Sequence, residues 1–393
     1  MDVRPRRVLL SCAPAPGHLY PLLPLGRALR SQGHTVAVLT SASLREVVGD
    51  EGLRFLPAGP GVEALIAAAV QTRPEMASLD PVGMRAAIPI FADVRIELTL
   101  ADALVASAWG PDLVISEHAD FVGPLLAARI GVNHVTLGFG PGHPADWLEL
   151  AAQAVAPHYT AEGLIPPPRG GLYEGMYLDT CPPSLQAPEF PVPPRRRFLR
   201  PEPYGAPSTS WSPPEFGDRS DRPLVLLTMG TLFGNPATFN AALAGLAALD
   251  VNVLVTVGPQ GDPAMVVADP TWVRVERFAP LRQVLDHCDL VVAHGGAGTT
   301  LAALARGIPL VLLPQATDQF INAKRAVAAG AAISLAPAEF TSEALQHAVR
   351  RVRNETNYAV AAARIRDEVA AMPTAAQVAA ELFGATTTQA AAA

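Results

Sequence analysis

The first part of the chain alternates short apolar runs with segments of helical periodicity. Residues 7–12 form an apolar run of strand length, a helical pattern covers about residues 20–32, and a second apolar run covers residues 35–40. The alternation continues with strands expected at 54–56, 112–116 and 134–137 and helices expected at 44–49, 81–108 and 121–130. Strands that alternate with helices indicate a parallel sheet that is covered on both faces.

The pattern becomes irregular between residues 138 and 222. One further helix is expected at residues 147–156, and the remainder is rich in proline and poor in periodicity. Residues 206–222 are polar and proline-rich, which is typical of a linker. We therefore expect an N-terminal domain over residues 1–205, followed by a linker over 206–222.

A second alternating pattern begins at residue 223. Strands are expected at 224–228, 252–257, 273–275, 290–293 and 310–313, and helices at 236–249, 341–353 and 358–372, with another that ends at Arg306. This pattern predicts a second α/β domain over residues 223–373. The predicted fold class is thus α/β, with two Rossmann-like, doubly wound parallel-sheet domains. Residues 374–393 are expected to form one short helix and then a disordered tail.

The composition narrows the class of protein. Apolar residues make up 50% of the 393 residues, but no run approaches the roughly 18 uninterrupted apolar residues of a membrane span. The arginines near the start lead directly into a strand rather than into a signal sequence, so we expect a soluble, cytoplasmic protein. The net charge is −7 and Lys324 is the only lysine, so no nucleic-acid partner is expected. Cys12, Cys181 and Cys288 show no metal-ligand spacing.

A glycine-rich loop follows the strand expected at residues 290–293. The sequence HGGAGTT lies between this strand and a helical pattern, and Gly307 ends that helix. Glycines allow close approach to a ligand, and the N–H groups at a helix start favour an anion, most naturally a phosphate. The loop lacks the Walker A lysine, and Leu301 occupies the third glycine position of the dinucleotide fingerprint.

The histidine before the glycines and a PxxxDQ turn about twenty residues later complete a more specific pattern. This pattern resembles the donor-nucleotide motif of the GT-B glycosyltransferases, and it is most similar to the bacterial natural-product (antibiotic) branch of the UDP-glycosyltransferase-type family. The resemblance implies two domains that face across a cleft. It also implies that the C-terminal domain binds the nucleotide sugar through two groups of residues. The diphosphate would be held by His294, Gly296, Gly298 and Thr299, and the donor sugar by Asp318 and Gln319.

Two further positions of the C-terminal domain match the family. Thr231 matches a small hydroxyl residue that contacts the donor phosphate. The segment RFAPLRQVL matches the base-binding segment, in which Phe278 would cover a pyrimidine and the Ala279 backbone would bind its edge. Uracil and thymine both remain open, and the bacterial resemblance favours a thymidine diphosphate (TDP) sugar over a uridine diphosphate (UDP) sugar.

Two residues of the N-terminal domain lie where expected strands end. His18 follows the first strand in the sequence GHLYP, and Glu117 follows the strand DLVIS. If these strands are neighbours, both side chains overlook one crevice. A histidine is well suited to take a proton near neutrality, and a carboxylate on its other nitrogen would orient it. In the resembled family these positions hold the general base and its carboxylate partner, which is more often aspartate. We expect nearby His118 at the rim and Asp120 as a helix cap.

The acceptor pocket of the resembled family is built from loops of the N-terminal domain and from the region near Phe91. This makes Phe91, Trp147, Tyr173 and Tyr177 candidate acceptor-binding residues, because an apolar lining suits a hydrophobic aglycone. The alternative is that these aromatic side chains only pack the loops against the domain.

The resemblance implies an inverting transfer of a sugar or deoxysugar to a hydroxyl of a hydrophobic natural-product aglycone. The sequence contains no D-x-D motif for a metal–diphosphate bridge, so we expect metal-independent turnover without a cofactor, stabilised by loop amides and His294. The sugar and the aglycone are not identified, transfer to nitrogen or carbon stays open, and a homodimer is one option for the oligomeric state. The last helix is expected to cross back onto the N-terminal domain.

Three other functions remain as alternatives. A nucleotide-sugar epimerase of the GT-B type would need carboxylates on the sugar from both domains and no acceptor pocket. A non-catalytic paralogue that activates a partner enzyme would typically lack the base or the phosphate loop. A nicotinamide-dependent oxidoreductase is disfavoured because no GxGxxG follows the first strand.

Overall fold

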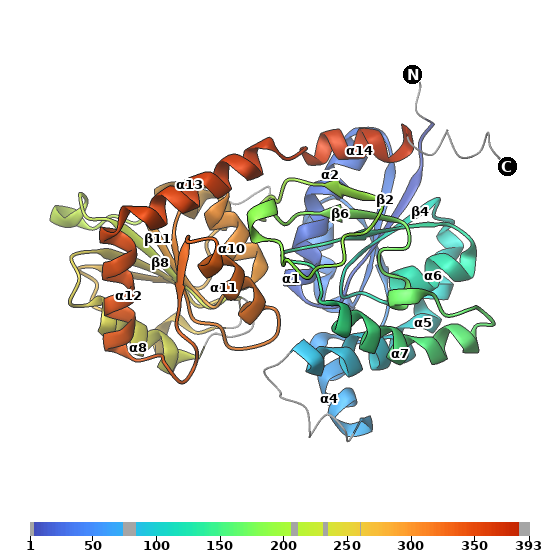
Figure 1. The fold of residues 1–393 in the computed structure, drawn as a ribbon, viewed down its shortest axis with the longest axis horizontal. Coiled ribbons are helices and arrows are strands. Elements are labelled where there is room, and N and C mark those ends of the chain that lie inside the picture. Colours follow the sequence, from blue (N-terminus) through green and yellow to red (C-terminus); the bar gives the residue numbers. More distant parts are fainter. Residues whose placement is uncertain (1–3, 74–83, 206–210, 231–234, 260, 385–393) are drawn as a thin grey trace. The chain divides into compact units, whose positions relative to one another are not determined.

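The computed structural model describes residues 4–73, 84–205, 211–230, 235–259 and 261–384 (Figure 1). It divides into two compact units. The N-terminal unit comprises Met1–Cys181, Ala187–Glu202 and Met372–Ala393, and the C-terminal unit comprises Pro182–Gln186 and Pro203–Ala371. The predicted phosphate contact Thr231 and the tail expected to be disordered lie outside the described residues.

The described part of the N-terminal unit contains one parallel sheet with the strand order β3-β2-β1-β4-β5-β6-β7. Its strands are β1 (Arg7–Ser11), β2 (Thr35–Thr40), β3 (Arg54–Pro57), β4 (Leu113–Glu117), β5 (Asn133–Leu137), β6 (Met176–Asp179) and β7 (Arg196–Phe198). The chain builds outward from β1 in one direction and then returns to add β4 on its other side. The sheet therefore has its topological switch point between β1 and β4.

Helices cover both faces of this sheet because alternate residues of β1 face opposite sides. Leu9 belongs to a core cluster with the helices α5, α6 and α7, whereas Leu10 lies directly beneath Gly26 of α2. The principal helices of the unit are α1 (Pro16–Leu19), α2 (Leu23–Ser31), α3 (Arg45–Asp50), α4 (Val62–Thr72), α5 (Arg95–Ala106), α6 (Val122–Ile130), α7 (Ala145–Ala161) and α14 (Ala375–Gly384), with the π-helical segment η5 (Pro89–Val94) before α5.

Several elements differ from the sequence prediction. The first helix was expected at about residues 20–32, but it begins at Pro16 and passes through a 3₁₀ turn, η1 (Tyr20–Leu22), before α2. Pro16 suits the first helical position, and prolines in the next turns break the regular periodicity. Strands β6 and β7 were missed because they contain only four and three residues and show little apolar alternation.

The described part of the C-terminal unit also contains one parallel sheet, with the strand order β10-β9-β8-β11-β12-β13. The strands are β8 (Leu224–Thr228), β9 (Asn252–Thr256), β10 (Val273–Glu276), β11 (Leu290–Ala293), β12 (Leu310–Leu312) and β13 (Ala332–Ser334). The helices are α8 (Pro236–Leu246), α9 (Leu281–Val284), α10 (Ala297–Leu304), α11 (Gln319–Ala328), α12 (Ser342–Asn354) and α13 (Thr356–Ala371). The predicted fold class, two parallel-sheet α/β domains, is confirmed.

The last helix belongs to the N-terminal unit. In Figure 1, α14 lies beside α2, and the Gln32 side chain donates to the Ala376 carbonyl at 2.8 Å. The His34 and Phe383 rings are 4.6 Å apart, and Arg197 pairs with Glu381 at 2.7 Å. Across the described ranges, no helix combines the length and the hydropathy that a membrane span requires.

The packing of α14 predicts how two substitutions on this helix will differ. Val378 is 1% exposed, so Val378→Asp places a carboxylate against apolar neighbours. We expect it to lower the free energy of unfolding of the N-terminal unit by about 2–4 kcal/mol. Ala380→Asp, on the exposed face of the same helix, should change it by less than about 1 kcal/mol. Denaturant unfolding followed by circular dichroism checks both, and equal effects would show that α14 is not docked through this face.

Candidate functional site

His18 and Glu117 lie together at the switch point of the N-terminal sheet. Strands β1 and β4 are parallel neighbours, and Ser11 is paired with Ser116 in their register. Both strands therefore end at the same edge of the sheet, as the sequence prediction required. The His18 Nδ1 atom lies 2.9 Å from the Glu117 Oε1 atom. The two predicted residues thus form a hydrogen-bonded dyad.

The Glu117 carboxylate is held by several donors and has no exposed surface. Besides His18, its Oε1 atom accepts the backbone N–H of Ala13 at 3.1 Å, and its Oε2 atom accepts the backbone N–H of Ala119 at 2.6 Å. Hydrogen bonds of this kind fix the direction of the carboxylate. These contacts direct one carboxylate oxygen of Glu117 toward the His18 ring.

Two aromatic side chains contact the His18 ring. The Phe91 ring of η5 lies 5.3 Å from it, and the Phe139 ring lies 5.2 Å from it in an edge-on arrangement. Phe91 was a candidate acceptor-binding residue in the sequence analysis, whereas Phe139 was not singled out. The signal that could have identified Phe139 is its position two residues after β5, at the same end of the sheet as Glu117.

The structure places the other three acceptor candidates in the hydrophobic core of the unit. Trp147, Tyr173 and Tyr177 are almost completely buried, and the rings of Tyr173 and Tyr177 meet edge to face at 4.8 Å. Tyr177 lies on β6, one of the strands that the sequence pattern did not indicate. These side chains pack the loops against the sheet, which was the alternative interpretation, and they present no surface to an acceptor.

His118 is buried rather than at the rim. Its ring lies between Phe139 and His143, 4.3 Å from each, and His143 stacks on Trp147 at 3.9 Å. Burial lowers the pKa of His118 well below its ordinary value and lowers the pKa of His143 to about 4. Both imidazoles are therefore neutral near pH 7. With Phe139 and Trp147 they form a continuous series of ring contacts that reaches the His18 ring.

The glycine loop of the C-terminal unit also lies at a topological switch point. Strand β8 has β9 on one side and β11 on the other, and the loop follows β11 directly. Gly295 adopts a left-handed φ of 86°, and Gly296 precedes α10 without a side-chain cap. The first N–H groups of α10 consequently point out of the helix at the strand edge where ligands bind in such sheets. Gly298 is exposed there, and Thr299 is half-buried.

His294 is held tightly between two glycines. A Cβ atom on Gly230 would lie 2.5 Å from His294 Cε1, and a Cβ atom on Gly296 would lie 2.5 Å from His294 Nε2. Burial lowers the pKa of His294 to about 4, against the smaller opposite effect of a hydrogen bond to the Thr228 backbone. The imidazole is therefore neutral near pH 7, and its position depends on the absence of side chains at both glycines.

The turn before α11 holds the Asp318-Gln319 pair in two different environments. The buried Gln319 side chain accepts the backbone N–H groups of Gln315 and Ala316 at 2.8 and 3.2 Å, so it stabilises the turn itself. Asp318 is half-buried and accepts the Asn322 side-chain amide at 2.9 Å. Of the two predicted sugar-binding residues, only Asp318 has a side chain that is partly open to solvent.

Asn322 connects this turn to the glycine loop and was not singled out in the sequence. Its side-chain amide donates to the Gly295 carbonyl at 2.9 Å as well as to Asp318. Its spacing, four residues after Asp318 and so on the same face of a helix, is the signal that could have identified it. At the predicted base-binding segment, the Phe278 ring is 42% exposed and Ala279 is buried.

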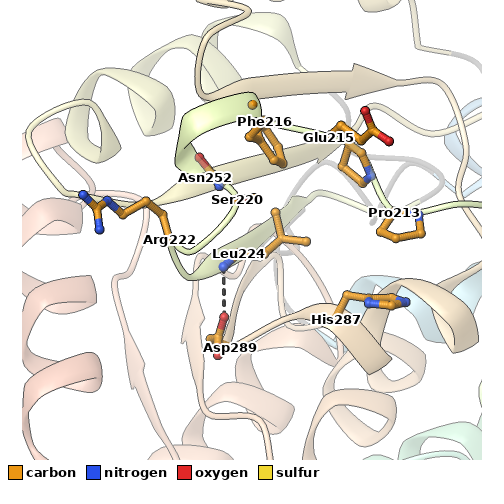
Figure 2. Close-up of a pocket in the computed structure, with 11 residues that line it drawn as sticks. Pro213, Glu215, Phe216, Ser220, Arg222, Leu224, Asn252, His287 and Asp289 are labelled. Carbon is orange, nitrogen blue, oxygen red and sulfur yellow. Dashed lines mark hydrogen bonds between the residues drawn. The ribbon is translucent and has the colours of Figure 1, made fainter.

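The C-terminal unit also contains a cavity of about 590 Å³ that is separate from the glycine loop (Figure 2). Leu224, Asn252 and Asp289 line it at the amino ends of β8, β9 and β11, together with linker residues such as Phe216 and Arg222. Asp289 accepts the Leu224 backbone N–H at 2.9 Å. The cavity is therefore at the opposite sheet edge from the glycine loop and does not coincide with the candidate phosphate site. Within the described ranges, no group of three or more His, Cys, Asp and Glu residues could hold a metal ion.

Comparison with known proteins identifies relatives along nearly the whole chain. The elloramycin glycosyltransferase ElmGT of Streptomyces olivaceus is 33% identical, and the match covers 98% of this chain and 99% of the relative. The spinosyn rhamnosyltransferase SpnG, solved with thymidine diphosphate, has a TM-score of 0.78 and 27% identity and covers 96% of this chain and 99% of its own. The glycosyltransferase SsfS6 of Streptomyces sp. SF2575, also solved with thymidine diphosphate, has a TM-score of 0.78, 25% identity and the same coverage.

Two family models match the two halves of the chain. The N-terminal domain of the erythromycin biosynthesis protein CIII-like family matches residues 27–190, and its C-terminal domain matches residues 240–384. Together they cover well over half of the chain, and the structural neighbours SpnG and SsfS6 match 96% of it. The protein therefore belongs to the erythromycin biosynthesis protein CIII-like family and is a bacterial natural-product glycosyltransferase with the GT-B fold.

Proposed function

We propose that the protein transfers a sugar or deoxysugar from a TDP-sugar to a hydroxyl group of a hydrophobic natural-product aglycone, with inversion and without a metal ion. The observation that carries this proposal is the His18–Glu117 dyad at the switch point of the N-terminal sheet. The choice of TDP is supported by SpnG and SsfS6, both solved with thymidine diphosphate. SpnG was also solved with the spinosyn aglycone, which supports an aglycone as acceptor.

The dyad supplies a general base. When His18 Nδ1–H donates to Glu117, the Nε2 atom carries the lone pair and can accept a proton. The acceptor hydroxyl gives its proton to Nε2 while its oxygen forms the new bond to the anomeric carbon. The bond from that carbon to the diphosphate oxygen breaks, and the nucleoside diphosphate leaves with the electron pair. Glu117 stabilises the resulting imidazolium, and a single displacement inverts the configuration.

The departing diphosphate gains negative charge that the protein must stabilise. The N–H groups at the start of α10 offer preorganised donors, and the open position of Gly298 lets a phosphate approach them. Asp318 is the candidate for a hydrogen bond to a sugar hydroxyl. The exposed Phe278 ring provides a face on which a pyrimidine can stack. Backbone donors of this type can replace a metal ion in offsetting the charge.

The surroundings of His18 favour an apolar acceptor. Phe91 and Phe139 cover two sides of the imidazole, and the small cluster of Leu65, Ala69 and Val94 lies against Phe91. A hydroxyl attached to a flat, hydrophobic aglycone can reach the base while its carbon skeleton contacts the aromatic rings. This is why we propose an aglycone rather than a free sugar as the acceptor.

Removal of the base tests the proposal directly. We expect His18→Ala to lower kcat by about 10²- to 10⁴-fold, because general base catalysis contributes on this scale. Glu117→Gln should lower kcat by about 10-fold or more, because the imidazolium loses its counter-charge. The assay is release of thymidine diphosphate from a panel of TDP-sugars mixed with hydrophobic aglycones.

His347→Ala is the matched control for the dyad variants, because this histidine is exposed on α12. Its kcat should equal that of the unmodified protein. Aglycone-dependent turnover that survives His18→Ala unchanged would overturn the assignment of the base.

Metal removal provides a second test. We expect turnover in excess EDTA to stay within about twofold of that with added magnesium, because the donors at the start of α10 supply the charge stabilisation. The measurement is the initial rate of thymidine diphosphate release under both conditions. A complete loss in EDTA that magnesium restores would contradict the metal-independent mechanism.

The packing around His294 predicts the effect of a single added methyl group. Gly296→Ala forces a Cβ atom against the imidazole, so we expect TDP to bind about 10- to 100-fold more weakly. Gly49→Ala is the matched control, since a Cβ atom there meets nothing within 4 Å. Isothermal titration with TDP and with UDP measures both variants. An unchanged dissociation constant for Gly296→Ala would show that the His294 position is not needed for donor binding.

A further inference from the structure

A buried ion pair lies next to the dyad, and the reaction described above does not use it. Arg95 is 1% exposed and Asp120 has no exposed surface. The Arg95 Nη2 and Nε atoms donate to Asp120 Oδ1 at 3.0 and 3.2 Å. Asp120 also accepts the backbone N–H of Val122, the first residue of α6, at 3.0 Å while it serves as the counter-ion of Arg95. The N-cap of α6 is Phe121, so the prediction that Asp120 is the helix cap is wrong.

The same guanidinium binds the loop that leads to His18. Arg95 Nη2 donates to the Cys12 backbone carbonyl at 2.7 Å. The residue before Cys12, Ser11, donates its hydroxyl to Asp120, and the residue after it, Ala13, donates its N–H to Glu117. Three consecutive residues at the end of β1 are thus fixed by Asp120, Arg95 and Glu117 in turn.

Arg95 is also the first residue of α5, directly after the π-helical segment η5. This segment carries Phe91, whose ring contacts His18. A π-helical turn is an uncommon backbone geometry that occurs often at functional sites. One side chain therefore joins the element that presents Phe91 to the loop that presents His18.

Burial of an ion pair is weak evidence for a role in stability, because well-packed apolar side chains can fill such a space without desolvating two charges. An apolar pair could not donate to the Cys12 carbonyl or hold the Ser11 hydroxyl. A lysine could supply the charge but only one compact donor group, whereas the planar guanidinium reaches two acceptors in fixed directions. Neither an apolar pair nor a lysine would therefore hold the Cys12 carbonyl and the Asp120 carboxylate in these fixed directions.

We propose that Arg95 is a positioning residue for the His18–Glu117 dyad, acting through the Cys12 carbonyl and the Asp120 carboxylate; this inference rests on the proposed role of His18 as general base. Arg95 does not touch the reacting atoms. It holds the end of β1 against β4, so that the Ala13 N–H and the His18 ring converge on the same carboxylate oxygen. From its position at the start of α5, it also keeps the Phe91 ring in contact with the His18 ring.

The test uses two variants of the full-length protein. Arg95→Lys keeps the charge and much of the buried stem, and the double variant Arg95→Met with Asp120→Asn removes both charges and so leaves no unpaired ion in the core. Because a small misplacement of a catalytic group is costly, we expect kcat to fall by about 10- to 100-fold in the double variant and by less in Arg95→Lys. The KM for the TDP-sugar and the dissociation constant of TDP should stay within about twofold of the unmodified values.

The controls separate positioning from general damage. Arg129→Lys changes an exposed ion pair with Glu162 in the same unit and should leave kcat unchanged. Unfolding transitions of all variants show whether the assay temperature lies below melting. If the double variant does not fold, the kcat, the donor KM and the TDP binding of Arg95→Lys are judged by the same criteria. The lysine keeps a positive charge beside Asp120, so this variant leaves no unpaired ion in the core.

The outcomes distinguish this proposal from the function on which it rests. A low kcat with unchanged donor KM and TDP binding supports positioning. A kcat within twofold of the unmodified protein, in a series where His18→Ala is inactive, overturns the role of Arg95 and leaves the proposed function intact. A kcat that falls only together with TDP binding or folding also overturns it. If His18→Ala itself remains active, the base assignment fails, and the positioning role fails with it.

Discussion

The parallel pairing of β1 with β4 is the constraint on which the candidate chemistry depends. It brings two segments about one hundred residues apart in the chain to one sheet edge, and it places the His18 ring 2.9 Å from a fully buried carboxylate. A buried carboxylate is stable only when donors surround it, and Glu117 receives two backbone N–H groups besides the imidazole. The ion pair of Arg95 and the rings of Phe91 and Phe139 all lie against this same pair of strand ends.

The C-terminal unit uses the same principle for a different task. Its glycine loop also follows a strand at a topological switch point, but this edge presents helix N–H groups and a neutral histidine rather than a base with its carboxylate. The Asn322 side chain donates to both the Gly295 carbonyl and the Asp318 carboxylate, so one side chain connects the proposed diphosphate and sugar contacts. We thus propose proton transfer at the N-terminal sheet and stabilisation of the leaving group at the C-terminal sheet.

The fold and the dyad were largely predictable from the sequence, because long alternating patterns and strand-end motifs are local signals. The His18–Glu117 contact needed only the added assumption that two strands are neighbours. The burial of single side chains was harder to predict, since it depends on short elements that show no clear pattern in the sequence. Tyr177 was a candidate acceptor-binding residue, with packing as the alternative, and the four-residue strand β6 places it in the core. Arg95 was missed for a related reason, because its partners Cys12 and Asp120 lie on other elements of the fold, and the Gly295 partner of Asn322 does so too.

The configuration at the anomeric carbon of the product tests the central claim most directly. A single displacement driven by the His18–Glu117 dyad gives a product whose anomeric configuration is opposite to that of the TDP-sugar. The coupling constant of the anomeric proton, measured by NMR on the purified glycoside, reports it for any donor and aglycone pair that reacts. We predict inversion. Retention of configuration would require a second displacement or a different intermediate, and would contradict direct attack by the deprotonated acceptor.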